Sequence, residues 1–248
     1  MAKQSGLGSN LYVAGYNVSG DIGSVKEISS PLATLDSTGI DKYAMERLPG
    51  LRDGNLGYTS FFNDAALASH VAHKALPRTD VGVYYAHTTV LGAPAFAMTA
   101  KQIDYAGTRA DDGSFTFDIQ AQANSFGADW GKQLTAGVRT DTTATNGTGV
   151  DFGTGSTAFG LQAYVQVFAF TGTSVTIKIQ ESSDNAGDAY VDVTGGGFTV
   201  VSAAPTFERI QTTRALTVER YLRVVTTGTF SNVQFAVMVN RNPVTVSY

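Results

Sequence analysis

Two of the three histidines have a spacing that suits metal binding. His70 and His73 form an H-x-x-H pair, and His87 is the third. Imidazoles three residues apart on a helix can share a zinc ion, but helical zinc sites usually pair residues four apart and need a third ligand. We therefore interpret His70 and His73 as solvent-facing side chains on the polar side of a helix.

Four carboxylates cluster in the second half of the chain, within and around the segment ESSDNAGDAYVD. They are Glu181, Asp184, Asp188 and Asp192. Carboxylate oxygens in a turn are suitable calcium ligands, but the D-x-[DN]-x-[DN]-G order of a calcium loop is missing. Because turns are often acidic, an ordinary solvated turn is the favoured interpretation.

Aromatic and arginine side chains of the second half could line a sugar site. The candidates are Phe198, Phe207, Tyr221, Arg209 and Arg214. Such residues more often fill the core of a β-sandwich and its rim. This second interpretation is the one we favour.

No catalytic motif stands out. The segment GADWGKQ (127–133) resembles a phosphate-binding loop only superficially, since its spacing is one residue short and Gln133 replaces the hydroxyl that would hold magnesium. Ser156 lacks the G-x-S-x-G frame of a nucleophile elbow. We expect no enzyme and no cofactor, although two facing carboxylates of a glycosidase could not be recognised from one sequence.

Composition indicates an all-β chain. Of 248 residues, 43% are apolar and only 15% are charged, with 27 glycines. The net charge of −4 gives no basic face for reading nucleic acid. Cysteine is absent, so no disulfide is expected. We also expect no signal peptide and no membrane span, because no apolar run approaches about 20 residues.

Alternating patterns predict strands through residues 1–150. The expected strands cover 10–17, 20–29, 54–62, 80–90, 94–108, 114–124 and 128–138. The clearest is SFTFDIQAQAN, whose alternation places one set of side chains on a core face: Phe115, Phe117, Ile119, Ala121 and Ala123. The opposite face is polar and carries Thr116, Asp118, Gln120 and Gln122.

A long loop and a helix interrupt this pattern. Residues 29–57 show almost no periodicity, and a loop of this length in a compact domain is usually functional. It contains too many apolar residues for a free linker, so we expect an arm that contacts a neighbour. A helix is predicted over 63–76, with Leu67, Val71 and Ala75 on its apolar side and Pro77 ending it.

The second half also reads as strands. VTIKIQ and VQFAVMV alternate, and further strands are expected at 160–170, 188–193, 197–201, 206–214 and 219–227. The Gly/Thr-rich stretch 140–160 is interpreted as a linker or a domain boundary. The expected architecture is all-β with one short helix, with a β-sandwich at 1–150 and a second sandwich or jelly roll at 151–248.

The sequence resembles major tail tube proteins of long-tailed (siphovirus-type) bacteriophages. The resemblance rests on the loop and following segment DSTGIDKYAMERLPGLRDGNLGYTSFFND (36–64), on the helix after it, and on AKQIDYAGTRADDGSFTFDIQAQANSFGADWGKQLTAGVRTDT (100–142). The second half looks like an Ig-like or galactose-binding-like decoration domain. The resemblance implies a virion protein of the tail, assembled in the host cytoplasm.

The resemblance also implies partners. Tail tube proteins form hexameric rings that stack into a hollow tube for DNA ejection, together with tape-measure, tail-tip and tail-terminator proteins. Double-stranded DNA passes without sequence-specific contact, so the wall should be polar and not strongly basic. We expect Thr116, Asp118, Gln120 and Gln122 to face this lumen, although an ordinary solvent face has the same pattern.

The loop supplies the expected contacts between subunits. The candidates are Ile40, Tyr43, Met45, Glu46, Arg47 and Leu48, the two charged residues through ion pairs. The alternative is a binding module, either a phage head decoration protein or a carbohydrate-binding protein for host recognition. That alternative predicts binding to a capsid shell or to sugars, and no tube.

Overall fold

The computed structural model describes residues 5–153, 155–186 and 189–246. The chain is mostly β-strand with one short α-helix, and the strand pairs all run antiparallel, which confirms the expected fold class. The first half contains β1 (Asn10–Val13), β2 (Tyr16–Asn17), the 3₁₀ helix η1 (Ser19–Asp21), β3 (Ile22–Ser29), β4 (Leu32–Asp36), β5 (Arg47–Arg52), β6 (Asn55–Phe61), α1 (Ser69–His73), β7 (Val81–Ala86), β8 (Pro94–Arg109) and β9 (Phe115–Ala123). The rest of the chain contains β10 (Asp129–Gln133), β11 (Arg139–Asp141), β12 (Thr145–Asn146), β13 (Val150–Asp151), β14 (Leu161–Ser182), β15 (Val191–Gly197), β16 (Thr206–Gln211) and β17 (Tyr221–Arg241).

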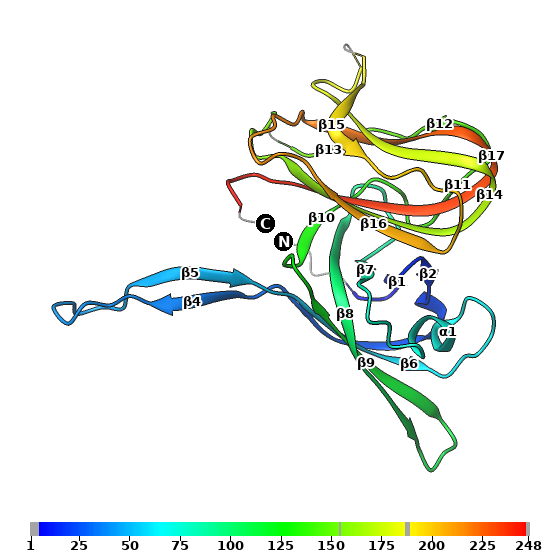
Figure 1. Cartoon of the computed structure of the whole chain (residues 1–248), viewed down its shortest axis with the longest axis horizontal. Helices are drawn as coiled ribbons and strands as arrows, with labels where there is room; N and C mark the ends of the chain where they lie inside the picture. The colour runs from blue at the N-terminus through cyan, green and yellow to red at the C-terminus, as the bar shows by residue number, and fades with distance from the viewer. Residues whose placement is uncertain (1–4, 154, 187–188, 247–248) are drawn as a thin grey trace.

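One hydrogen-bonded sheet runs through both halves of the chain. Its path is β15-β14-β17-β10-β8-β7-β1-β2, and β10 provides the junction. On one side Asp129 pairs with Ala97 of β8, and on the other Lys132 pairs with Val239 of β17. Figure 1 shows the β14–β17 sandwich above and the β1–β9 part below. The division into two β-domains near residue 150 stays a prediction.

Three buried clusters fill the molecule. The first lies inside the β14–β17 sandwich. The second is built mainly from residues of β1, β6, β7, β8 and β9. The third joins the halves, with Tyr12, Tyr84 and Phe168 in edge-to-face contact at centroid distances of 5.2 and 4.9 Å. Alanines on β7, β8 and β17 surround these rings, and their small size lets the strands approach.

The predicted linker 140–160 is wrong as a linker. Three short strands within it, β11, β12 and β13, follow β17 as antiparallel neighbours. The small polar side chains of this stretch suit a ribbon at the rim of a sandwich. In the same half, the strands expected at 160–170 and 175–179 join into the 22-residue β14, which is bulged around Gly172.

The helix is shorter than predicted. It covers Ser69–His73 instead of 63–76, because Leu67 and Leu76 adopt positive φ angles and Ala68 is extended. The carboxylate of Asp21 accepts the Ser69 amide at 3.0 Å and so fixes the start of the helix from 48 residues away. Among the described residues, no helix is long and apolar enough to span a membrane.

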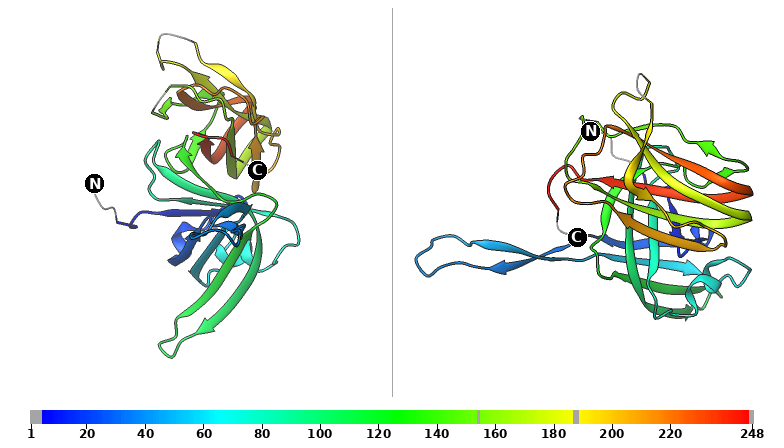
Figure 2. Two further views of the ribbon diagram at one scale, coloured as in Figure 1. Left: turned by 90° about the vertical axis from the view of Figure 1, so that its left-hand side faces the viewer. Right: turned by 45° about the horizontal axis from the view of Figure 1, so that its top comes forward.

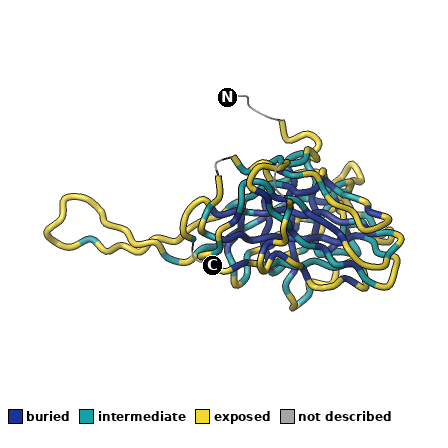
Figure 3. The backbone as a smooth tube through the Cα atoms, turned by 90° about the horizontal axis from the view of Figure 1, so that it is seen from above, coloured by how far each residue is buried: buried dark blue, intermediate teal, exposed yellow. Residues whose placement is uncertain are grey.

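The predicted long loop 29–57 contains a β-hairpin. Strands β4 and β5 form a separate two-stranded sheet with Leu35 opposite Leu48 and Asp36 opposite Arg47. We call residues 31–53 the arm. It extends far from the body, and its backbone is exposed almost throughout while the body has a buried interior (Figures 1 and 3).

Candidate assembly surfaces

The arm exposes apolar side chains without a covering partner in the chain. The exposed set is Leu32, Leu35, Ile40, Tyr43, Met45, Leu48 and Leu51. Ile40 and Tyr43, near the tip, have the full exposure of an isolated residue. Large apolar side chains gathered on one projecting ribbon are typical of an interaction site.

The tip of the arm is ordered by its own hydrogen bonds. The Ser37 amide donates to the Glu46 carbonyl at 3.0 Å, and the Glu46 amide donates to Oγ1 of Thr38 at 2.9 Å. Glu46 also lies 3.5 Å from Lys42, and Arg47 contacts the sulfur of Met45 at 3.1 Å. All six candidate contact residues therefore lie on the arm, in a defined hairpin and open to a partner.

The root of the arm is tied to the body at β10. Arg52 donates to the Ala128 carbonyl at 2.8 Å and lies 3.0 Å from the carboxylate of Asp129. Ser30 donates to the same carbonyl at 3.1 Å. Asp129 is buried, and sequence analysis missed it because its partners come from distant strands.

The predicted polar face lies on the sheet β3-β6-β9-β8. Asp118, Gln120 and Gln122 are exposed and Thr116 is half-buried, while Ile119 and Ala121 of the same strand are buried. Asp118 lies 2.6 Å from Lys26 and accepts a hydrogen bond from Thr59 at 2.8 Å, and both interactions lower the pKa of its carboxyl group. The face is therefore polar, and the negative charge of Asp118 is balanced by Lys26.

This four-stranded sheet ends in two open edges. Among the described residues, β3 pairs with β6 alone. In the part of the chain that the structure describes, β8 beyond Ala100 pairs only with β9, because Ala100 lies opposite Val81, the first residue of β7. The β8–β9 hairpin projects beyond the body, as Figure 2 shows in its left view. Open edges invite pairing with another chain, and bulges such as those in β3 and β8 restrict which partner fits.

His73 belongs to the core, and His70 is half-buried beside it. His73 is buried, not solvated as predicted, and its Nε2 lies 2.5 Å from the Tyr58 hydroxyl. His70 Nδ1 lies 2.8 Å from the hydroxyl of Tyr105. Ser69 and His73 point inward because the short helix presents the i, i+4 pair to the sheet. The histidines thus serve packing.

The other chemical candidates are held apart. Asp192 binds Lys178 at 2.6 Å, Glu181 accepts the Glu219 amide at 2.8 Å, and Asp188 lies outside the described residues. Among the described residues, no group of three or more potential metal ligands comes together. Lys132 lies on strand β10 and donates to the Asp151 carbonyl at 2.7 Å, so it does not form a phosphate loop.

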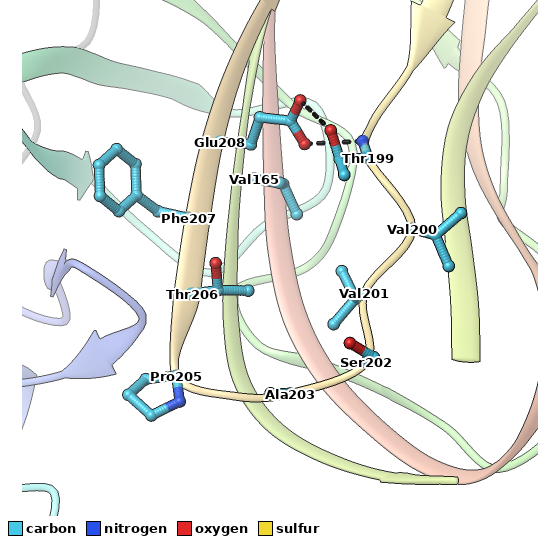
Figure 4. Close-up of a pocket in the computed structure, with 10 residues that line it drawn as sticks. All are labelled: Val165, Thr199, Val200, Val201, Ser202, Ala203, Pro205, Thr206, Phe207 and Glu208. Atoms are coloured by element: carbon cyan, nitrogen blue, oxygen red, sulfur yellow. Dashed lines mark hydrogen bonds between the residues drawn. The ribbon is translucent and has the colours of Figure 1, made fainter. Parts of the chain in front are cut away.

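The aromatic and arginine candidates of the second half do not converge either. Phe198 is buried in the sandwich core, and Arg209 stacks on Phe126 at 3.8 Å. A pocket of about 530 Å³ lies beside β16 (Figure 4). Three of its ten lining residues are valines, and both carboxylate oxygens of Glu208 already accept hydrogen bonds from Thr199.

Comparisons with known proteins find phage structures. No family model matches the chain, and no curated protein matches it. One similar structure is that of the SPP1 Dit (gp 19.1) protein, described as a paradigm of the hub adsorption apparatus in phages infecting Gram-positive bacteria. It shares 12% sequence identity with this chain at a TM-score of 0.31, and the match covers 94% of this chain and 99% of that chain. A chain of the phage p2 baseplate in its activated conformation with Sr has 9% identity and a TM-score of 0.31, covering 94% and 98%. A chain of the phage P2 baseplate with Ca has 9% identity and a TM-score of 0.34, covering 96% and 99%.

Proposed function

We propose that this chain is a structural protein of the phage tail that forms hexameric rings, which stack into a tube for the passage of double-stranded DNA. The observation that carries the proposal is the arm, whose exposed leucines, Ile40, Tyr43 and Met45 are not covered by any part of the chain that the structure describes. Such an arm gains its burial only from a neighbouring subunit. The sequence resemblance to tail tube proteins supports the same role.

The open sheet edges supply a way to close the ring. In our proposal, β3 of one subunit pairs with the outer part of β8 of the next, which removes both edges at once. The polar face with Thr116, Asp118, Gln120 and Gln122 then lines the lumen. Its balanced charge suits DNA that must slide, since a basic wall would hold phosphate.

The remaining roles follow from this arrangement. The β14–β17 sandwich decorates the outside of the tube, and Glu46 or Arg47 forms ion pairs with a neighbour. The partners are further copies of this chain and the tape-measure, tail-tip and tail-terminator proteins. The location is the tail of the virion, and we propose no catalytic role.

Electron microscopy of the purified protein at rising concentration tests the proposal. The wild-type protein should form rings with a central hole and then tubes. Deleting residues 34–50 joins two chain ends that leave the body side by side, as the pairing of Leu32 with Arg52 shows. This variant should remain a folded monomer.

A matched control removes exposed apolar surface elsewhere. The double substitution Val191→Ser and Val200→Ser changes two exposed valines remote from the arm and should leave tubes intact. Tubes formed by the arm-deleted variant would overturn the arm's role. Rings that never stack would argue for a hub-like single ring instead of a tube, and monomers bound to glycans would favour the binding-module alternative.

A further inference from the structure

A shallow apolar groove lies beside the root of the arm. Its volume is about 420 Å³, and its walls include Pro94, Trp130, Lys132, Phe152, Arg241 and Pro243. Trp130 is the only tryptophan of the chain and is 48% exposed, although its ring packs edge-on against buried Phe96 at 5.3 Å. A tryptophan held rigidly at a surface is typical of the centre of a protein interface.

The charges of the groove and the arm are complementary. Both charged residues of the groove wall, Lys132 and Arg241, are basic. The outer arm, residues 36–47, carries three acidic side chains, Asp36, Asp41 and Glu46, against two basic ones, Lys42 and Arg47. The outer arm thus has a net charge of −1, opposite in sign to the two basic residues of the groove wall, although Lys132 donates to the Asp151 carbonyl and Arg241 is buried against backbone carbonyls. This difference in sign favours the approach of the arm to the groove.

The arm of the same copy cannot fill this groove. Arg52 at the root contacts Asp129, the residue before Trp130, and from there the arm extends away from β10 (Figure 1). Strands β4 and β5 have five and six residues, and with the turn beyond them they carry the tip roughly 20 Å or more outward. Each copy therefore has an empty groove at the root of its arm and an uncovered arm that ends beyond its own body.

We propose that the arm of one copy docks in the Trp130 groove of a second copy through the face that carries Leu35 and Leu48. These two leucines are cross-strand partners and so lie on one side of the ribbon. The inference rests on the proposed ring-forming function and names the surface that receives the arm. Trp130 then stacks over leucine side chains at the centre of the contact.

Engineered cysteines test this pairing directly, because the chain has none of its own. Leu48→Cys and Pro243→Cys are purified separately, mixed under assembly conditions and oxidised. We expect a disulfide-linked dimer of the two variants. The matched control pairs Leu48→Cys with Val200→Cys, an exposed position outside the groove, and should give no such dimer.

Trp130 offers a second readout. As the only tryptophan, it should show a blue-shifted emission maximum when the wild-type protein assembles. The substitution Trp130→Ala should raise the concentration at which rings form by about 10-fold or more, with the monomer still folded. Circular dichroism and urea unfolding of that variant check its folding.

The outcomes separate this inference from the proposed function. Rings without the crosslink and without the blue shift overturn the groove assignment and leave the ring proposal standing. The crosslink without rings supports the groove and overturns the ring. If neither the rings nor the crosslink form, both the groove assignment and the ring proposal are overturned.

Discussion

The guanidinium group of Arg52 lies 3.0 Å from the buried carboxylate of Asp129, and this contact ties the arm to both halves of the molecule. Asp129 also accepts from the Tyr164 hydroxyl at 2.5 Å and lies 3.5 Å from the Asn240 amide. Burial, reinforced by the charge of Asp129, raises the pKa of Tyr164. One carboxylate therefore connects the arm root, β14 and β17.

Replacing Arg52 with alanine should destabilise the monomer by about 1–3 kcal/mol. The substitution leaves the buried charge of Asp129 with hydrogen bonds but without its cation. Urea unfolding measures the change. The control Arg47→Ala, at an exposed arm position, should stay within about 0.5 kcal/mol of wild type. An unchanged midpoint for Arg52→Ala would show that the ion pair does not support the fold.

The turn between β1 and β2 should not accept a side chain at Gly15. This glycine has φ of +82°, and a Cβ there would lie 2.5 Å from the Thr206 amide and 2.7 Å from the Val167 carbonyl. Its amide donates to Gln166 at 2.6 Å, so it marks close contact between the two halves. We expect Gly15→Ala to cost about 2–4 kcal/mol in thermal or urea unfolding. Gly20→Ala, with open space around it, should cost at most about 1 kcal/mol, and equal losses would contradict this account.

Acid should weaken the fold through His73. Burial, and secondarily the neighbouring His70, lowers the pKa of His73 to about 4. The unfolded chain, with a histidine pKa of about 6.5, therefore binds the proton more readily than the folded chain. Stability is unaffected above pH ~6.5 and falls as the pH drops from there to ~4, by about 3 kcal/mol in total.

Urea unfolding between pH 7.5 and 4.5 checks this slope. The variant His73→Gln should lose less stability over that range than wild type, because its amide does not titrate. The same substitution at His87, outside the Tyr58–His73 cluster, is the control. Identical slopes for wild type and His73→Gln would assign the acid sensitivity to other groups.

The proposed lumen makes a prediction about DNA. Replacing Gln120 and Gln122 with lysine should cause assembled tubes to retain double-stranded DNA at low salt and release it at high salt. Filter binding over a salt series measures this effect. Val200→Lys adds a lysine at an exposed position of the second half and serves as the control. If control tubes retain DNA equally, the face carrying Gln120 and Gln122 does not line the lumen.

Local patterns in the sequence predicted the positions of the strands more accurately than they predicted the contacts between strands. The alternation in SFTFDIQAQAN predicted β9 and the burial of Ile119 and Ala121, but Phe115, also expected on the core face, is 39% exposed at the start of the strand. The helix boundary was wrong because Asp21, distant in sequence, fixes the first residue of α1. Strand β5 was missed because Pro49 and Gly50 break the pattern, which an isolated two-stranded ribbon tolerates.

Long-range partners also explain what was missed at the candidate site. Asp129 and Arg52 are unremarkable in sequence, and only the fold brings them together. His73 was expected in solvent because helix periodicity was extended over 14 residues, whereas the five-residue helix turns His73 toward Tyr58. The arm's exposed apolar residues, in contrast, were visible in the sequence because no periodic element could bury them.

The position of β10 has a thermodynamic consequence. Its backbone is hydrogen-bonded to β8 on one side and to β17 on the other, so neither half can lose its sheet without breaking the ladder of the other. Heat or denaturant should therefore melt the monomer in a single cooperative transition, with equal calorimetric and van't Hoff enthalpies. A subunit of this kind responds to mechanical load as one body, so a force applied to one half is transmitted through β10 to the other.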